Sequence, residues 1–136
     1  MFIAANWKMN LNKKQIQEYI VHLENFQFND RVKACIFPSF IFIDYLSSLI
    51  LDKSISLGSQ NCHFETNGAF TGDISPYSLK QYGCEYVILG HSERREQYNE
   101  NNNFIKKCAH SAIDAGLMPI ICVGESIEIR NSGNAI

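Results

Sequence analysis

The sequence predicts an α/β protein whose strands form a parallel sheet. Five short apolar segments, rich in residues that favour strands, alternate with segments in which apolar residues recur at helical spacing. Because a helix separates each strand from the next, the chain must cross over to add each new strand, and such crossovers are right-handed. Polar residues follow the apolar segments directly, at the edge where parallel α/β sheets bind ligands.

Composition indicates one domain, residues 1–136, with a real core. The chain is 46% hydrophobic and 19% charged, and its net charge is −2 without a basic block. We therefore expect no nucleic-acid or membrane-surface partner. The five cysteines are irregularly spaced and fit buried free thiols in a reducing cytosol better than disulfides or a zinc site. No segment approaches a membrane span or has the pattern of a leader, so a soluble, cytoplasmic protein is expected.

Three strands and two helices are expected in the first half. They are a buried strand over 2–8, an amphipathic helix from a cap at Asn12 to about Phe26, a turn at 29–30, a strand over 32–37, a helix capped by Ser39 and a strand over 55–58. An aperiodic segment over 60–73 follows and is interpreted as a loop, and loops of this length usually serve a function or bind a partner. Its residues Phe64, Ala69 and Phe70 should expose apolar surface for a second subunit.

The second half repeats the alternation. The expected elements are a short helix from Ser75-Pro76 to near Gly83, a strand over 86–89, a helix capped by Ser92, a helix with its apolar stripe over 104–113, a strand over 118–123 and a further strand-to-helix turn at 124–126. Inward apolar side chains are expected at Ile3, Ile36, Leu57, Val87 and Ile121.

His91 lies where a predicted strand ends and a predicted helix begins. The helix N-terminus disfavours a proton on a nearby imidazole, so His91 should stay neutral and could donate a hydrogen bond to a substrate oxygen. The simpler interpretation is that His91 only caps the helix. Lys8 has a similar position, because an apolar strand leads directly into it, although it could also be an ordinary surface lysine.

Two architectures fit this alternation. A five-stranded, doubly wound sheet would be complete at this length, whereas a (β/α)8 barrel needs ~250 residues and would be represented by its first five units. Length alone favours the doubly wound sheet. A doubly wound nucleotide-binding protein should, however, have a glycine-rich loop after its first strand, and residues 6–10 contain no glycine.

Four motifs favour the barrel. They are Ala5-Asn6-Trp7-Lys8-Met9-Asn10, Gln60-Asn61 with Gly68-Ala69-Phe70-Thr71-Gly72, Gly90-His91-Ser92-Glu93-Arg94-Arg95 and Cys122-Val123-Gly124-Glu125. In this order and at this spacing they resemble the triosephosphate isomerase family. The resemblance covers the whole chain but only the N-terminal part of the family, through its fifth strand. It therefore implies a (β/α)8 barrel of which 1–136 hold the first five units.

The resemblance also implies an activity. Members of the family are homodimers that need no cofactor or metal and interconvert dihydroxyacetone phosphate and D-glyceraldehyde 3-phosphate in glycolysis and gluconeogenesis. By motif, Asn6 and Lys8 would contact the substrate, Lys8 would stabilise the enediolate, and His91 would be the catalytic electrophile. Glu93 would be the active-site carboxylate near the lysine, although an acidic residue in the first turn of a helix needs no such role.

The resemblance also concerns Thr71 and Cys122, and it implies that the catalytic glutamate is not among residues 1–136. Thr71 would enter the neighbouring subunit, although it could also be an ordinary exposed loop threonine. Cys122 matches the family's strand-five cysteine, and we interpret it as a packing residue because no motif makes it a thiolate. Asp73 and the single proline Pro38 depart from the family pattern. The family's catalytic glutamate, its lid and its phosphate-binding Gly-Gly loop would all lie beyond residue 136, so the chain alone is expected to be inactive. The alternative is a non-catalytic half-barrel or binding module that assembles with another chain.

Overall fold

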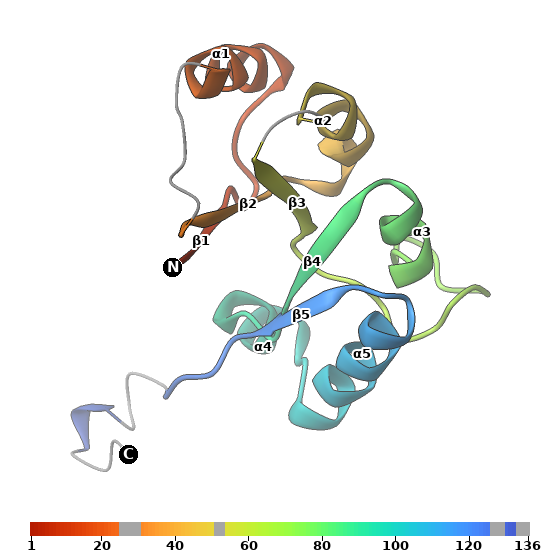
Figure 1. Ribbon diagram of the computed structural model, residues 1–136. Coiled ribbons are helices and arrows are strands. Elements are labelled where there is room, and N and C mark those ends of the chain that lie inside the picture. The colour runs from red at the N-terminus through yellow and green to blue at the C-terminus, as the bar shows by residue number, and fades with distance from the viewer. Residues whose placement is uncertain (25–30, 51–53, 126–129, 133–136) are drawn as a thin grey trace.

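The computed structural model describes residues 1–24, 31–50, 54–125 and 130–132. Five strands form one parallel sheet in the order β1-β2-β3-β4-β5: β1 (Phe2–Asn6), β2 (Lys33–Phe37), β3 (Ile55–Ser59), β4 (Cys84–Leu89) and β5 (Met118–Ile121). Each new strand is added on the same side of the previous one. This order excludes the doubly wound sheet, in which the direction of strand addition reverses. Figure 1 shows the sheet curled into an arc.

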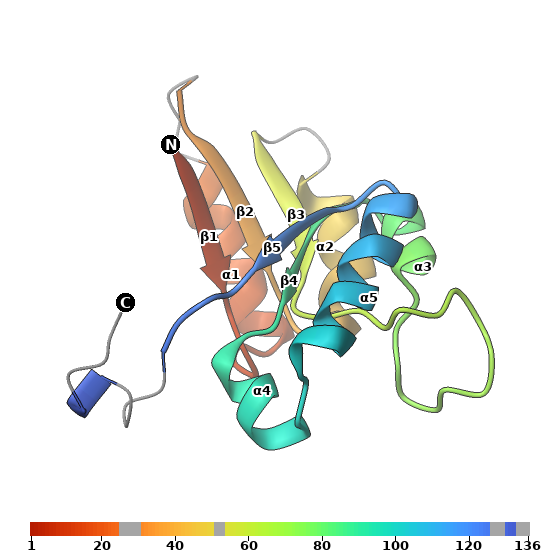
Figure 2. The same ribbon diagram turned by 90° about the horizontal axis from the view of Figure 1, so that it is seen from below.

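Most of the helices cover the outside of this arc. The helices are α1 (Lys13–Glu24), the 3-10 helix η1 (Phe40–Phe42), α2 (Ile43–Ile50), α3 (Pro76–Gln81), α4 (Ser92–Tyr98) and α5 (Asn102–Asp114). In Figures 1 and 2, α1, α2, α3 and α5 pack on the convex face, and α4 lies beyond the ends of the strands. The arrangement is that of the first five units of a (β/α)8 barrel, as the motifs predicted.

The two faces of the sheet carry separate apolar clusters. Ile36, Leu57 and Val87 are buried in the larger cluster, which the helices complete with residues such as Ile16 and Leu46. The concave face carries a smaller cluster of Cys35, Phe37, Ile88, Tyr86, Ile120 and Cys122.

The prediction of the inward side chains was therefore wrong. Ile36, Leu57 and Val87 face the helices. Ile3 and Ile121 lie on this same face, because the strand register pairs Ile3 with Ala34 and Ile121 with Leu89, and both partners belong to the larger cluster. A strand buried on both faces is apolar at every position, so its sequence does not reveal which alternate set points inward.

The first strand was predicted to be buried and is not. Among the described residues, β1 pairs only with β2, and β5 pairs only with β4. Phe2 and Ile3 in β1 are 41% and 42% exposed, and Ile121 in β5 is 48% exposed. The Phe2 ring instead reaches across the concave face to the Tyr86 ring, with the centroids 4.9 Å apart. The strands at the two ends of the arc thus leave apolar surface uncovered.

Several element boundaries differ from the predictions. β4 begins at Cys84, two residues before the predicted start, and β5 ends at Ile121 instead of residue 123. His91, rather than Ser92, caps α4. The helix stripe predicted over 104–113 lies in α5. The turn at 29–30, the end of the first helix beyond Glu24 and the last residue of the 124–126 turn lie outside the described residues.

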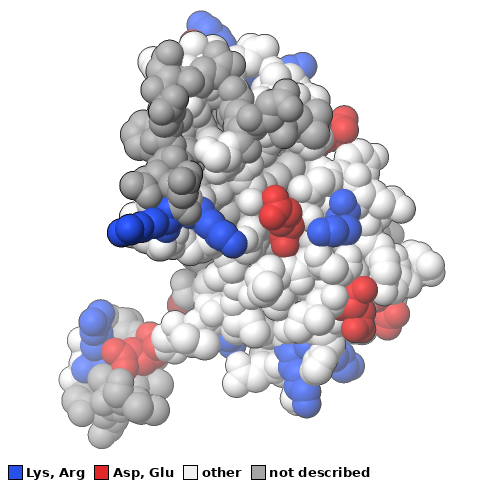
Figure 3. Space-filling model, in the orientation of Figure 1, with Lys and Arg blue, Asp and Glu red and all other residues white. Residues whose placement is uncertain are grey.

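On the face shown in Figure 3, small groups of basic and acidic side chains are scattered over a largely uncharged surface. Within the described ranges, no helix is long and apolar enough to cross a membrane.

Candidate active site

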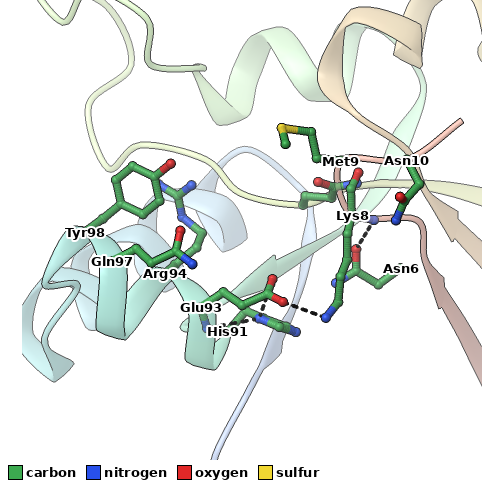
Figure 4. A pocket seen from close by; sticks show the side chains of 10 residues that line it. Asn6, Lys8, Met9, Asn10, His91, Glu93, Arg94, Gln97 and Tyr98 are labelled. Atoms are coloured by element: carbon green, nitrogen blue, oxygen red, sulfur yellow. Dashed lines mark hydrogen bonds and ion pairs between the residues drawn. The ribbon is translucent and has the colours of Figure 1, made fainter. Parts of the chain in front are cut away.

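Polar side chains from the ends of β1, β3 and β4 meet around one cavity of about 450 Å³. It is lined by Asn6, Lys8, Met9, Asn10, Gln60, His91, Glu93, Arg94, Gln97 and Tyr98. Figure 4 shows Lys8 extending from the end of β1 toward the first turn of α4, where Glu93 meets it above His91. The structure therefore brings together the four predicted site residues Asn6, Lys8, His91 and Glu93.

Lys8 and Glu93 form the shortest contact in this cluster. Nζ of Lys8 lies 2.6 Å from Oε1 of Glu93, and both side chains are about half exposed (48% and 47%). The hydrogen bond from Lys8 is the main reason why the pKa of Glu93 is lowered, and the charge of Lys8 acts in the same direction against a smaller rise from desolvation. Glu93 is therefore a stable carboxylate that fixes the lysine head group.

The backbone of Lys8 is held in an unusual conformation. Its φ angle is +53°, in the left-handed region that residues other than glycine rarely adopt. Its N–H donates to Oδ1 of Asn6 at 3.0 Å. Its carbonyl accepts from Nε2 of Gln60 at 2.8 Å and from Oγ of Ser39 at 3.1 Å. Side chains from the end of β1 and from the residues after β2 and β3 thus hold the backbone of Lys8 in this conformation.

The supporting roles of Ser39 and Gln60 were not predicted. Gln60 also donates to the carbonyl of Phe37 at 2.9 Å, which ties the end of β2 to Lys8. Gln60 belongs to one of the four motifs and Ser39 was predicted as a helix cap, but neither signal predicts a hydrogen bond to the carbonyl of Lys8.

His91 caps α4 and also lines the cavity. Its Nδ1 accepts the backbone N–H of Glu93 at 3.3 Å. An accepting Nδ1 carries no proton, so this geometry assigns the proton of a neutral ring to Nε2. Nδ1 also lies 3.4 Å from Oε2 of Glu93, but the hydrogen bond from the N–H already occupies its lone pair. His91 therefore does cap the helix, and this hydrogen bond orients the ring while the residue also lines the cavity.

Thr71 lies apart from this cavity. It is exposed on the loop between β3 and α3, which projects from the body in Figure 2. Buried His63 anchors the loop, because its ring stacks on Phe64 at 4.3 Å and contacts Phe70 at 4.5 Å. Phe64 also packs against Phe104 of α5, so part of the expected apolar loop surface is used within the chain.

The cysteines have the chemistry of packing residues. All five are free thiols. Burial raises the pKa of Cys62, Cys84 and Cys108 to about 12. Burial also raises the pKa of Cys122, while the nearby charge of Arg95 opposes the rise. A protonated thiol is a poor nucleophile, which agrees with the packing role predicted for Cys122.

A parallel sheet that is wound sequentially and curls into an arc defines a protein of the (β/α)8 barrel class, of which the described residues supply the first five units. The family profile described as triosephosphate isomerase matches residues 1–136, and the chain belongs to the triosephosphate isomerase family.

Individual relatives agree with this assignment. Triosephosphate isomerase from Aquifex aeolicus is 42% identical over 132 residues, which are 96% of this chain and 53% of that protein. The enzyme from Ligilactobacillus salivarius is 41% identical over 98% of this chain and 53% of its own length. The crystal structure of triosephosphate isomerase from Bartonella henselae superimposes with a TM-score of 0.90 at 38% identity, covering 98% of this chain and 55% of that one. The chain thus spans about half the length of the relatives it matches.

Proposed function

We propose that this chain supplies the N-terminal half of a triosephosphate isomerase that interconverts dihydroxyacetone phosphate and D-glyceraldehyde 3-phosphate in glycolysis and gluconeogenesis. The observation that carries the proposal is the convergence of Lys8, Glu93 and His91 on one cavity. Lys8 follows β1, whereas His91 and Glu93 follow β4, so the curl of the sheet brings together side chains from two strands that are not neighbours.

Each residue has a chemical role that its geometry supports. The ammonium group of Lys8 faces the cavity and can stabilise the phosphate and the negative charge that develops on an enediolate. The proton on Nε2 of His91 can be donated to the substrate carbonyl oxygen. Triosephosphate isomerase is itself a standard example of a neutral histidine paired with a carboxylate base. Asn6 shapes the turn before Lys8 and lines the same cavity.

The base that removes the carbon-bound proton is proposed to come from beyond residue 136. Among the described side chains at the cavity, Glu93 is bound to Lys8 and its lowered pKa makes it a weak base. His91 is assigned as the donor and cannot act as the carbon base in the same step. Within the described residues, β1 and β5 each pair with a single strand, which would give further barrel units a place to pair.

The completed protein is proposed to be a cytoplasmic homodimer. Thr71 would enter the neighbouring subunit, and its exposed position on a projecting loop supports that role. The five free thiols suit a reducing compartment.

A fused chain tests the isomerase proposal. The part of the Aquifex aeolicus enzyme beyond the aligned region is joined after Ile136, and conversion of glyceraldehyde 3-phosphate is measured. The expected result is turnover that is lost in the matched fusion carrying His91→Gln. A fusion that is folded by circular dichroism but inactive would contradict the proposal.

A further inference from the structure

Arg95 connects three segments beside His91. From α4 its guanidinium donates to the carbonyl of Gly90 at 2.7 Å, to Oδ1 of Asn102 at 2.8 Å and to the carbonyl of Cys122 at 3.2 Å. Gly90 follows β4, Asn102 begins α5 and Cys122 follows β5. All three acceptors are neutral oxygens, so the guanidinium group is not part of an ion pair here and instead holds the three segments in fixed positions.

Arg95 binds the backbone carbonyl groups before and after the Cα atom of His91. Its side chain binds the carbonyl of Gly90, the residue before His91. Its backbone N–H donates to the carbonyl of His91 at 3.0 Å. A shift of Arg95 would therefore move the peptide that carries the imidazole.

Gly90 leaves the space that the guanidinium occupies. Its φ angle is +67°, and a Cβ at this position would lie 2.8 Å from Nη2 of Arg95 and 2.8 Å from Cδ1 of Ile105. A side chain at residue 90 would be strained and would displace the guanidinium. The glycine before the histidine and the arginine four residues after it form one structural unit.

We propose that Arg95 is a positioning residue for His91, a proposal that rests on the proposed isomerase function. It fixes the imidazole against the cavity and holds the end of β5 beside it. Lysine cannot replace it, because an ammonium group lacks the planar fork that reaches three acceptors at fixed angles. Displacing a catalytic group by about 1 Å can cost on the order of 100-fold in rate.

The test uses the fused chain with Arg95→Lys, which keeps the charge, and Arg95→Met, which keeps much of the stem. Glu96→Gln, on the exposed side of the same helix, is the control. Both Arg95 variants should lower kcat by about 10- to 100-fold while KM stays within about twofold. The ¹⁵N NMR signals of the His91 imidazole should shift in both variants and not in the control.

The activity of the unmodified fusion tests the isomerase proposal, and the His91 NMR signals test the positioning role of Arg95. If the unmodified fusion is inactive, the isomerase proposal fails, and the His91 signals still decide whether Arg95 positions the ring. Folded Arg95 variants with unchanged His91 signals would overturn the positioning role, whether their activity is normal or reduced. If Arg95→Met does not fold, Arg95→Lys gives the same decision.

Discussion

Nζ of Lys8 lies 2.6 Å from Oε1 of Glu93, although the two residues are 85 positions apart and follow β1 and β4, which are not neighbouring strands. In a flat sheet, three strand spacings would place these strands about 14 Å apart. The curl of the sheet shortens this gap, so the contact is a direct consequence of barrel geometry. The same curl creates the cavity that the pair lines.

Lys8→Met should raise the KM of the fused chain for glyceraldehyde 3-phosphate steeply, because it removes a charge that both ground state and transition state experience. Lys14→Met, on the exposed side of α1, is the matched control and should leave KM unchanged. Steady-state kinetics measures both. An unchanged KM in Lys8→Met would place the lysine outside the site.

Glu93 should titrate below the ordinary glutamate value of 4.5, because the hydrogen bond from Lys8 lowers its pKa. A lowered pKa in the folded state means that the carboxylate favours folding at pH values above its unfolded pKa. That contribution is lost as the pH falls through the lower, folded pKa. Carboxyl ¹³C NMR measures the titration, with Glu93→Gln identifying the signal. In Lys8→Met the midpoint should rise, and a midpoint that stays the same would show that Lys8 does not cause the shift.

His91→Gln should lower turnover of the fused chain by at least ~100-fold, the low end for a positioned acid–base group. Glutamine retains a polar side chain but cannot donate and recover a proton as imidazole does. His110→Gln, on the exposed side of α5, is the control and should remain active. Full activity of His91→Gln would reduce His91 to a helix cap.

Thr71→Arg should shift the fused chain from dimer toward monomer, since a long charged side chain would replace a small one at the projecting loop. Gln17→Arg adds the same charge on the exposed surface of α1 and should leave the dimer intact. Sedimentation velocity distinguishes the two states. Identical sedimentation of both variants would count against a role of this loop in assembly.

Much of the fold could be predicted because helical periodicity and short apolar runs are local properties. The alternation alone could not predict the strand order, because it also fits a doubly wound sheet, and only the four motifs favoured the barrel. The inner face of the sheet was assigned wrongly for a related reason, since Ile36 and Cys35 are both apolar and both buried.

The sequence predicted which residues line the candidate site, but not the hydrogen bonds that hold those residues in place. Lys8 and His91 belong to recognisable motifs at strand ends, and the structure brings them to one cavity. Gln60, Ser39 and Arg95 act through backbone carbonyls of residues that are distant in the sequence. Every residue has a backbone carbonyl, so the sequence does not indicate which carbonyl accepts a given hydrogen bond, and only the folded structure shows these partners.

The most direct measurement compares the isomerase activity of purified 1–136 with that of the same chain fused to the C-terminal half of a relative. Proton abstraction next to a carbonyl needs a base in reach of that carbon, and in the proposed mechanism neither Glu93, bound to Lys8, nor His91, the proposed donor, supplies it. We expect no turnover above buffer for 1–136 and clear turnover for the fusion. Turnover by purified 1–136 alone would contradict a catalytic base that lies outside these residues.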